Sequence, residues 1–150
     1  MPEIWFYHLT QSRLFDALPG LLEKGLARGW RAVIQTSSET HMKALDDHLW
    51  SFRDEAFIPH GAEGSGLNAE DNPVWITIEE DNPNKANIRF LVDGAATKNL
   101  EGYERIVRMF DGHDPEALAA ARECWKNEKA AGYAVSYWQQ NEEGGWQKKA

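Results

Sequence analysis

Apolar residues in the first quarter of the chain follow two different spacings. The run from Ile4 to Tyr7 is apolar and aromatic with no polar alternation, which predicts a strand buried on both faces. A helical spacing then continues until Gly29. Its apolar positions are Leu14, Leu18, Leu21, Leu22 and Leu26, and Thr10 or Ser12 is expected to cap it.

The same order of spacings is then repeated. A second buried strand is expected at 31–36, around Val33 and Ile34. Ser37 or Ser38 can cap a second helix, whose apolar positions are Met42, Leu45, Leu49 and Trp50. An alternation of strand and helix predicts a layered α/β domain with a mainly parallel sheet and right-handed crossovers.

The remainder of the chain contains short strands separated by turn-forming residues. Residues 51–73 are rich in Gly, Asn, Asp and Pro, and they are expected to form a long surface loop. Residues 93–102 are expected to form a loop with a short helical turn. For 104–110 a helix is the alternative to a strand, and the sharp break after Phe110 favours the strand. Further strands are expected at 74–78, 87–92 and 133–138, followed by a polar tail at 141–150 with Trp146 as an aromatic anchor.

The segment from Asp114 to Tyr137 carries the clearest helix signals. Asp114 suits an N-cap, Pro115 suits the first helical position and Gly132 suits the end. A helical wheel places a set of small or apolar residues toward one side. These residues are Ala117, Leu118, Ala121, Cys124 and Ala131.

A basic stripe lies on another side of this predicted helix. Arg122, Lys126 and Lys129 recur at i, i+4 and i+7, and they border Trp125. A guanidinium beside a large aromatic ring suits a short acidic and apolar peptide better than a metal ion or a covalent reaction. The alternative is that the three basic residues form a solvated face and Trp125 belongs to the core.

Length and charge narrow the class of protein. A chain of 150 residues is a usual size for one domain, so residues 1–150 are expected to fold as one. The net charge of -8 disfavours tight binding to duplex DNA or to an anionic membrane, and it also disfavours a general single-strand-binding module. Cys124 is the single cysteine, so no internal disulfide is possible. The chain shows no leader and no window of transmembrane length, which predicts a cytoplasmic protein.

No catalytic or cofactor-binding constellation emerges from the sequence. The five histidines do not pair with cysteine or carboxylates at zinc-ligand spacing. Gly61, Gly64 and Gly66 occur in the order G-x-x-G-x-G, which is not the dinucleotide fingerprint. We therefore expect no cofactor and no catalytic site, and a nucleotide-dependent enzyme on an α/β sheet remains the alternative function.

Several motifs, in order, resemble the chi subunit family of bacterial DNA polymerase III. The matching segments are IWFYHL, RGWRAVI, LDDHLWSFRDEAFIPHG, PVWITI and AARECWKNEKAAGY, and they cover most of the chain. The most specific is LW followed by F-x-PHG, with Trp50, Phe57, Pro59, His60 and Gly61. The second is the run AR-x-x-W-K-x-x-K-x-x-G from Ala121 to Gly132.

This resemblance implies a noncatalytic adaptor with a three-layer Rossmann-like fold, whose helices cover both faces of the sheet. Family members sit on the clamp-loader side of the polymerase through a psi subunit and hold the acidic C-terminal tail of single-stranded-DNA-binding protein, so DNA is contacted indirectly. By motif, Arg122 matches the arginine that pairs with the terminal carboxylate of the tail. Trp125 matches an aromatic residue of the same pocket, and Lys126 and Lys129 match its basic neighbours.

The resemblance also implies a second binding surface. Trp50 and Phe57 match the aromatic pair on which psi, or an alternative clamp-loader or helicase partner, docks. Two positions depart from another form of the tail pocket. Leu118 and Asp111 stand where that form has a lysine and an apolar residue.

Overall fold

The chain folds around an eight-stranded sheet with the strand order β3-β4-β2-β5-β6-β1-β7-β8. The computed structural model describes residues 2–51 and 60–150, and for Trp50 and Ser51 only the backbone. The helices are α1 (Leu14–Ala27), α2 (Glu39–Ser51), α3 (Pro115–Ala130) and the short 3-10 helix η1 (Ala69–Asp71). The strands are β1 (Glu3–Leu9), β2 (Ala32–Gln35), β3 (His60–Ala62), β4 (Val74–Thr77), β5 (Ile88–Leu91), β6 (Arg105–Asp111), β7 (Val135–Gln140) and β8 (Trp146–Lys148).

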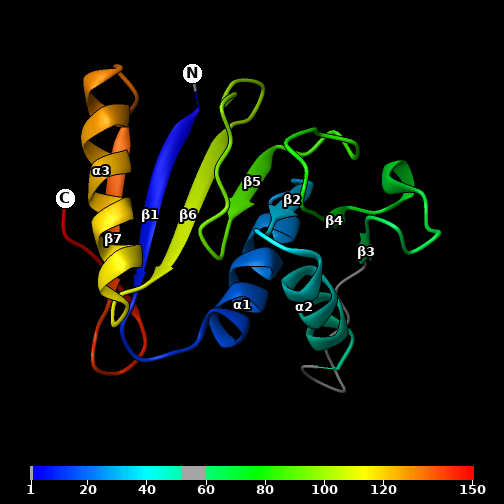
Figure 1. Ribbon diagram of the computed structural model, residues 1–150, viewed down its shortest axis with the longest axis horizontal. Coiled ribbons are helices and arrows are strands. Elements are labelled where there is room, and N and C mark those ends of the chain that lie inside the picture. The colour runs from blue at the N-terminus through cyan, green and yellow to red at the C-terminus, as the bar shows by residue number, and fades with distance from the viewer. Residues whose placement is uncertain (1, 52–59) are drawn as a thin grey trace.

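The sheet is mainly parallel, as predicted. Strand β1 lies between β6 and β7 and runs parallel to both. Among the described strands only β8 runs antiparallel to its neighbour, β7. Figure 1 shows α3 beside β7 and β1 at one end of the molecule, whereas α1 and α2 lie toward β2 and β4.

The two faces of the sheet bury separate apolar clusters, which is compatible with the predicted three-layer Rossmann-like fold. On one face Leu9, Ile34 and Phe90 pack with side chains of α1 and α2, among them Leu18 and Leu45. On the other face residues from β1, β5 and β6 pack against α3. This second cluster contains Ile4, Phe6, Leu91, Leu100, Ile106 and Ala121.

The start of α1 differs from the prediction. Its N-cap is Arg13, which makes no side-chain capping bond, rather than Thr10 or Ser12. The backbone N–H groups of Thr10, Gln11 and Ser12 instead all donate to the side-chain oxygen of Gln140, each at 3.0 Å. The chain entering α1 is therefore fixed to the end of β7. For α2 the capping prediction is correct, because the Ser38 hydroxyl accepts the N–H of His41 at 3.2 Å.

Three segments predicted as loop or tail are structured differently. The described part of 51–73 contains β3 and η1, and 93–102 forms turns without a helix. Residues 141–150 are not a polar tail, because β8 returns alongside β7. Asn141 accepts the N–H groups of Glu143 and Gly145 to close that hairpin, and the ring of Trp146 packs on Tyr7 with centroids 4.6 Å apart.

Candidate peptide-binding site

Helix α3 forms as predicted and presents the basic stripe to solvent. The side chain of Asp114 accepts the N–H groups of Glu116 and Ala117 at 3.0 and 3.4 Å. Arg122, Lys126 and Lys129 are all exposed. The cap thus fixes where the helix begins, and with it the face on which the stripe lies.

The inner side of α3 departs from the helical wheel at two positions. Ala131 is not packed inward but is the exposed C-cap residue. Glu128, which the wheel left unassigned, is buried and pairs with Arg108 of β6. Burial raises the pKa of the Glu128 carboxyl, and the Arg108 guanidinium opposes that shift. This ion pair anchors α3 to the sheet beneath it.

Trp125 belongs to the core and to the surface at once. Its half-buried ring meets Phe6 and Tyr137 edge to face, with centroid distances of 5.5 and 5.8 Å. On its other side the Lys129 ammonium lies 5.8 Å from the ring centroid. The two interpretations of Trp125 are therefore compatible, because one edge of the ring supports the sheet while the rest faces the basic stripe.

A surface hollow of about 460 Å³ lies between α3 and the end of the β7–β8 hairpin. It is lined by Arg122, Trp125, Lys126, Tyr137 and Ala150. Three of the four residues predicted for the tail pocket thus come together, and Lys129 lies one turn further along α3. Tyr137 was missed as a site residue, because the sequence does not show which strand lies beside α3.

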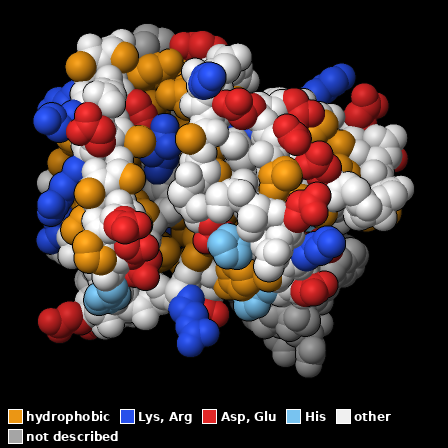
Figure 2. Space-filling model, viewed as in Figure 1, with side chains coloured by type: hydrophobic (Ala, Val, Ile, Leu, Met, Phe, Trp, Pro, Cys, Tyr) orange, Lys and Arg blue, Asp and Glu red, His pale blue; other side chains and the backbone are white. Residues whose placement is uncertain are grey.

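The Arg122 guanidinium is available to a ligand. Within residues 2–51 and 60–150 no carboxylate pairs with it, and no acidic side chain lines the hollow. Figure 2 shows Lys and Arg side chains gathered along the edge of the molecule that α3 and the C-terminal segment form. A guanidinium beside an aromatic ring can hold a carboxylate in fork geometry.

The electrostatic effects of Arg122 reach two neighbouring groups. Burial is the main cause that lowers the pKa of His8, and the charges of His113 and Arg122 lower it further, against Asp111. Burial also raises the pKa of the Tyr137 hydroxyl, and Arg122 opposes that rise. His8 and Tyr137 are themselves joined by a 2.8 Å hydrogen bond. The same positive field would favour a bound carboxylate.

The two positions that depart from the pocket expected from the resemblance are not among the residues that line this hollow. Leu118 is half-buried on α3, and Asp111 ends β6, where its carboxylate accepts the N–H of His113 at 2.9 Å. Neither residue lines the hollow between α3 and the hairpin.

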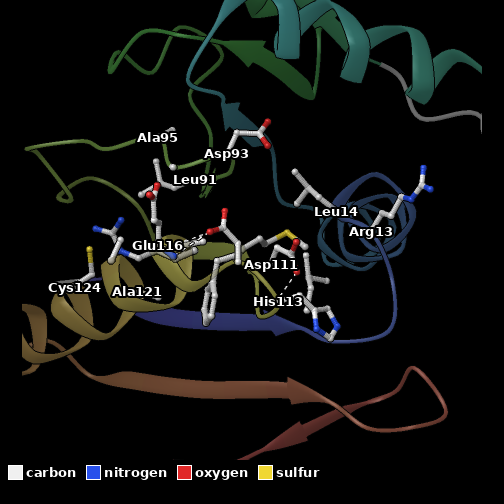
Figure 3. A pocket seen from close by; sticks show the side chains of 18 of the residues that line it. Arg13, Leu14, Leu91, Asp93, Ala95, Asp111, His113, Glu116, Ala121 and Cys124 are labelled. Carbon is white, nitrogen blue, oxygen red and sulfur yellow. Dashed lines mark hydrogen bonds between the residues drawn. The ribbon is translucent and has the colours of Figure 1, made fainter.

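A larger cavity of about 900 Å³ opens at the carboxyl ends of β1, β5 and β6. In an α/β sheet this is where a nucleotide would be expected. Figure 3 shows the acidic side chains of Asp93, Asp111 and Glu116 among those lining it. The N–H groups of the turn before α1, which could otherwise hold a phosphate, are already bound to Gln140. Both features disfavour an anionic nucleotide.

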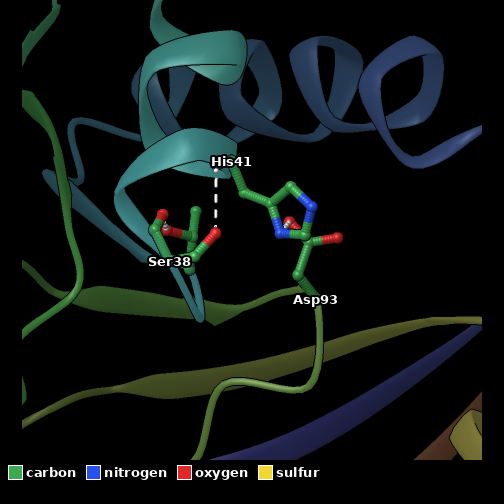
Figure 4. Close-up of polar contacts among 4 residues, drawn as sticks. Ser38, His41 and Asp93 are labelled. Carbon is green, nitrogen blue, oxygen red and sulfur yellow. Dashed lines mark hydrogen bonds and ion pairs between the residues drawn. The ribbon is translucent and has the colours of Figure 1, made fainter.

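Beside that cavity a serine, a histidine and an aspartate lie close together. The His41 ring lies 3.5 Å from the Asp93 carboxylate, and burial raises the pKa of Asp93 against the opposing effect of His41. Figure 4 shows that Ser38 is bonded to the backbone of His41 instead of its ring. This geometry is a helix cap next to a His–Asp contact and is not a nucleophile activated by a base.

The motif containing Trp50 and Phe57 is described only in part. Phe57 lies outside the described residues, as does the side chain of Trp50, whose backbone belongs to the last turn of α2. His60 is buried in β3, and its ring contacts the Asp46 carboxylate of α2 at 3.0 Å. A β-carbon on Gly61 would come within 2.7 Å of the Trp75 ring. The His-Gly pair of the motif therefore holds β3 against α2 and β4.

Two further observations concern metals and membranes. In the described ranges no three His, Cys, Asp or Glu side chains gather as a metal site would require. None of the helices described is both long enough and apolar enough to cross a bilayer.

Comparison with known proteins identifies the family to which this chain belongs. The family described as DNA polymerase III chi subunit, HolC, matches residues 1–136. A "Probable DNA polymerase III subunit chi" of Rickettsia prowazekii (strain Madrid E) is 26% identical over 110 residues, which is 73% of this chain and 66%, just under two thirds, of that protein. DNA polymerase III subunit chi of Pseudomonas aeruginosa is 27% identical over 115 residues, covering 77% of this chain and 78% of that protein.

The family match includes all of α3 and the Trp50 motif, and it ends just before Tyr137. It covers far more than half of the chain. The chain therefore belongs to the family of DNA polymerase III chi subunits, accessory subunits of DNA replication.

Proposed function

We propose that this chain is a noncatalytic accessory subunit that links the clamp-loader side of DNA polymerase III to single-stranded-DNA-binding protein. It does so by holding the acidic C-terminal tail of that protein in the hollow between α3 and the β7–β8 hairpin. The observation that carries the proposal is the Arg122 side chain, which lines the hollow beside Trp125 and has no carboxylate partner within residues 2–51 and 60–150.

The chemistry of the hollow fits the end of an acidic peptide. A terminal carboxylate presents two oxygens, and arginine offers two parallel donors where lysine offers a point charge. The rings of Trp125 and Tyr137 give an apolar side chain contact area at low entropic cost, because each has few rotatable bonds. A peptide that ends in an apolar residue with a free carboxylate satisfies both parts of the site.

Lys126 and Lys129 are expected to steer the peptide rather than to fix it. Both are exposed, so each acts mainly through long-range attraction that salt screens. Lys126→Ala with Lys129→Ala should lower the association rate about three- to tenfold at low salt, with little change in dissociation rate. Stopped-flow measurements with a labelled tail peptide at several salt concentrations test this. Parallel salt slopes for the double variant and the parent would contradict it.

The second partner is proposed from the sequence motif. Trp50 and Phe57 match the aromatic pair on which psi or another clamp-loader or helicase partner docks in the family. Trp50→Ala should then weaken capture of that partner about tenfold or more while leaving the melting temperature nearly unchanged, because hot-spot tryptophans contribute mainly to the interface.

The control for Trp50→Ala is affinity for the tail peptide, which should not change because α3 and the hairpin remain intact. Partner capture by pull-down and thermal unfolding are measured on the same preparation. A collapse of the melting temperature would instead assign Trp50 to the core.

A further inference from the structure

The end of the chain forms the second wall of the hollow. Strand β8 pairs with β7 so that Lys148 lies opposite Trp138. The pairing continues beyond β8, since the N–H of Lys149 donates to the carbonyl of Tyr137 at 2.7 Å and the N–H of Tyr137 donates to Ala150 at 3.3 Å. Figure 1 shows this C-terminal segment beside α3.

Two adjacent lysines lie opposite residues of different apolar clusters. Residues directly opposite each other in an antiparallel pair point to the same face, and successive residues alternate. Trp138 packs with the cluster on the α1 side, whereas Tyr137 packs with the cluster beneath α3. Lys148 lies opposite Trp138, on the α1 side. Lys149 and Ala150 both bond the backbone of Tyr137, a residue of the cluster beneath α3, so both lie opposite Tyr137, and Ala150 lines the hollow.

The charge of this wall complements an acidic ligand. Arg122 and Lys126 supply the positive charge on the α3 wall, and the exposed Lys149 is the neighbour of Ala150, which lines the opposite wall. The acidic residues of the hairpin, Glu142 and Glu143, lie at its turn, at the far end from Lys149. An acidic peptide between the walls would thus meet cations on both sides.

We propose that Lys149 is a further binding residue for the acidic segment that precedes the terminal carboxylate of the tail. This inference rests on the proposed function, and it adds a residue from beyond the family match, which ends at residue 136. Arg122 holds the terminal carboxylate, and Lys149 pairs with a carboxylate upstream of it. The peptide is then held between α3 and the hairpin rather than along α3 alone.

Lys149→Ala and Lys148→Ala form a matched pair for the test. Each removes one exposed positive charge from adjacent positions, so nonspecific attraction falls equally. The probe is the C-terminal peptide of the host's single-stranded-DNA-binding protein, titrated by calorimetry. Lys149→Ala should weaken binding about threefold, and Lys148→Ala should have less than half that effect on the binding free energy.

A second peptide separates this inference from the proposed function. In it the upstream Asp and Glu residues are replaced by Asn and Gln, while the terminal carboxylate stays free. The effect of Lys149→Ala should vanish with this peptide, whereas that of Arg122→Ala should persist. If Lys148→Ala and Lys149→Ala weaken binding equally while Arg122→Ala weakens it strongly, the role of Lys149 is overturned but the proposed function is not. No effect of any of the three variants would overturn the proposed function as well.

Discussion

Arg122→Ala is expected to weaken binding of the acidic tail peptide by about 2 kcal/mol, roughly thirtyfold. The guanidinium lies in the hollow and pairs with no carboxylate of the described chain, so its removal costs the ligand a partner without leaving a buried group of the protein unsatisfied. Calorimetric titration measures the affinity, and thermal unfolding of the variant should match that of the parent. Arg122→Lys should restore only part of the affinity, because an ammonium lacks the fork geometry.

The matched control for Arg122→Ala is Arg13→Ala. Arg13 is also exposed but lies at the start of α1, beside the larger cavity and away from the hollow. Arg13→Ala should weaken binding only by the small loss of nonspecific attraction that follows from removing one positive charge. Equal losses for the two variants would mean that the peptide responds to net charge and not to the site.

Arg89→Met should lower the free energy of unfolding by about 1–3 kcal/mol. The side chain of Arg89 is fully buried in β5, where its donors reach the side-chain oxygen of Gln35 at 2.6 Å, the Tyr103 hydroxyl at 3.0 Å and the backbone carbonyl of Asp81 at 2.8 Å. Methionine fits the apolar stem but leaves the buried Gln35 oxygen without its donor and removes the bonds to the part-buried oxygens of Tyr103 and Asp81. Denaturant unfolding followed by tryptophan fluorescence measures the change.

Arg28→Met controls for the loss of an arginine as such. Arg28 is exposed at the C-cap of α1 and lies over the Trp30 ring at 4.1 Å, so its replacement should cost no more than about 1 kcal/mol. A midpoint for Arg89→Met equal to that of the parent would show that the buried network does not stabilise the native state.

The elements that the sequence predicts well are those with a complete local pattern. The strand and helix order through α2 follows from runs long enough to show their period, and Asp114 with Pro115 marks the start of α3. The short strands β3 and β8 have no such pattern, because three residues are too few to show a period and acquire strand geometry only from a paired strand. Their existence depends on tertiary pairing.

The residues of the binding site differ in the same way: some follow from a local pattern and others depend on strand pairing. Arg122, Trp125 and Lys126 share one helix, so their neighbourhood follows from helical geometry. Tyr137 and Ala150 reach the hollow only through strand pairing, of β7 with β1 and of the C-terminal segment with β7, which no local pattern specifies. Arg89 is the one charged residue in β5, a strand that is buried on both faces. A charge in such a strand requires partners inside the protein, so this position could have indicated a buried hydrogen-bond network from the sequence.

The central claim is that Arg122 binds the terminal carboxylate of the tail. Its most direct test is a four-way calorimetric titration that combines the parent and Arg122→Ala with the free and the C-terminally amidated tail peptide. Amidation removes the carboxylate charge, so it should weaken binding to the parent about tenfold or more and should hardly affect the variant. If the free and amidated peptides bind the parent equally well, or if amidation weakens both proteins to the same extent, Arg122 does not hold the carboxylate.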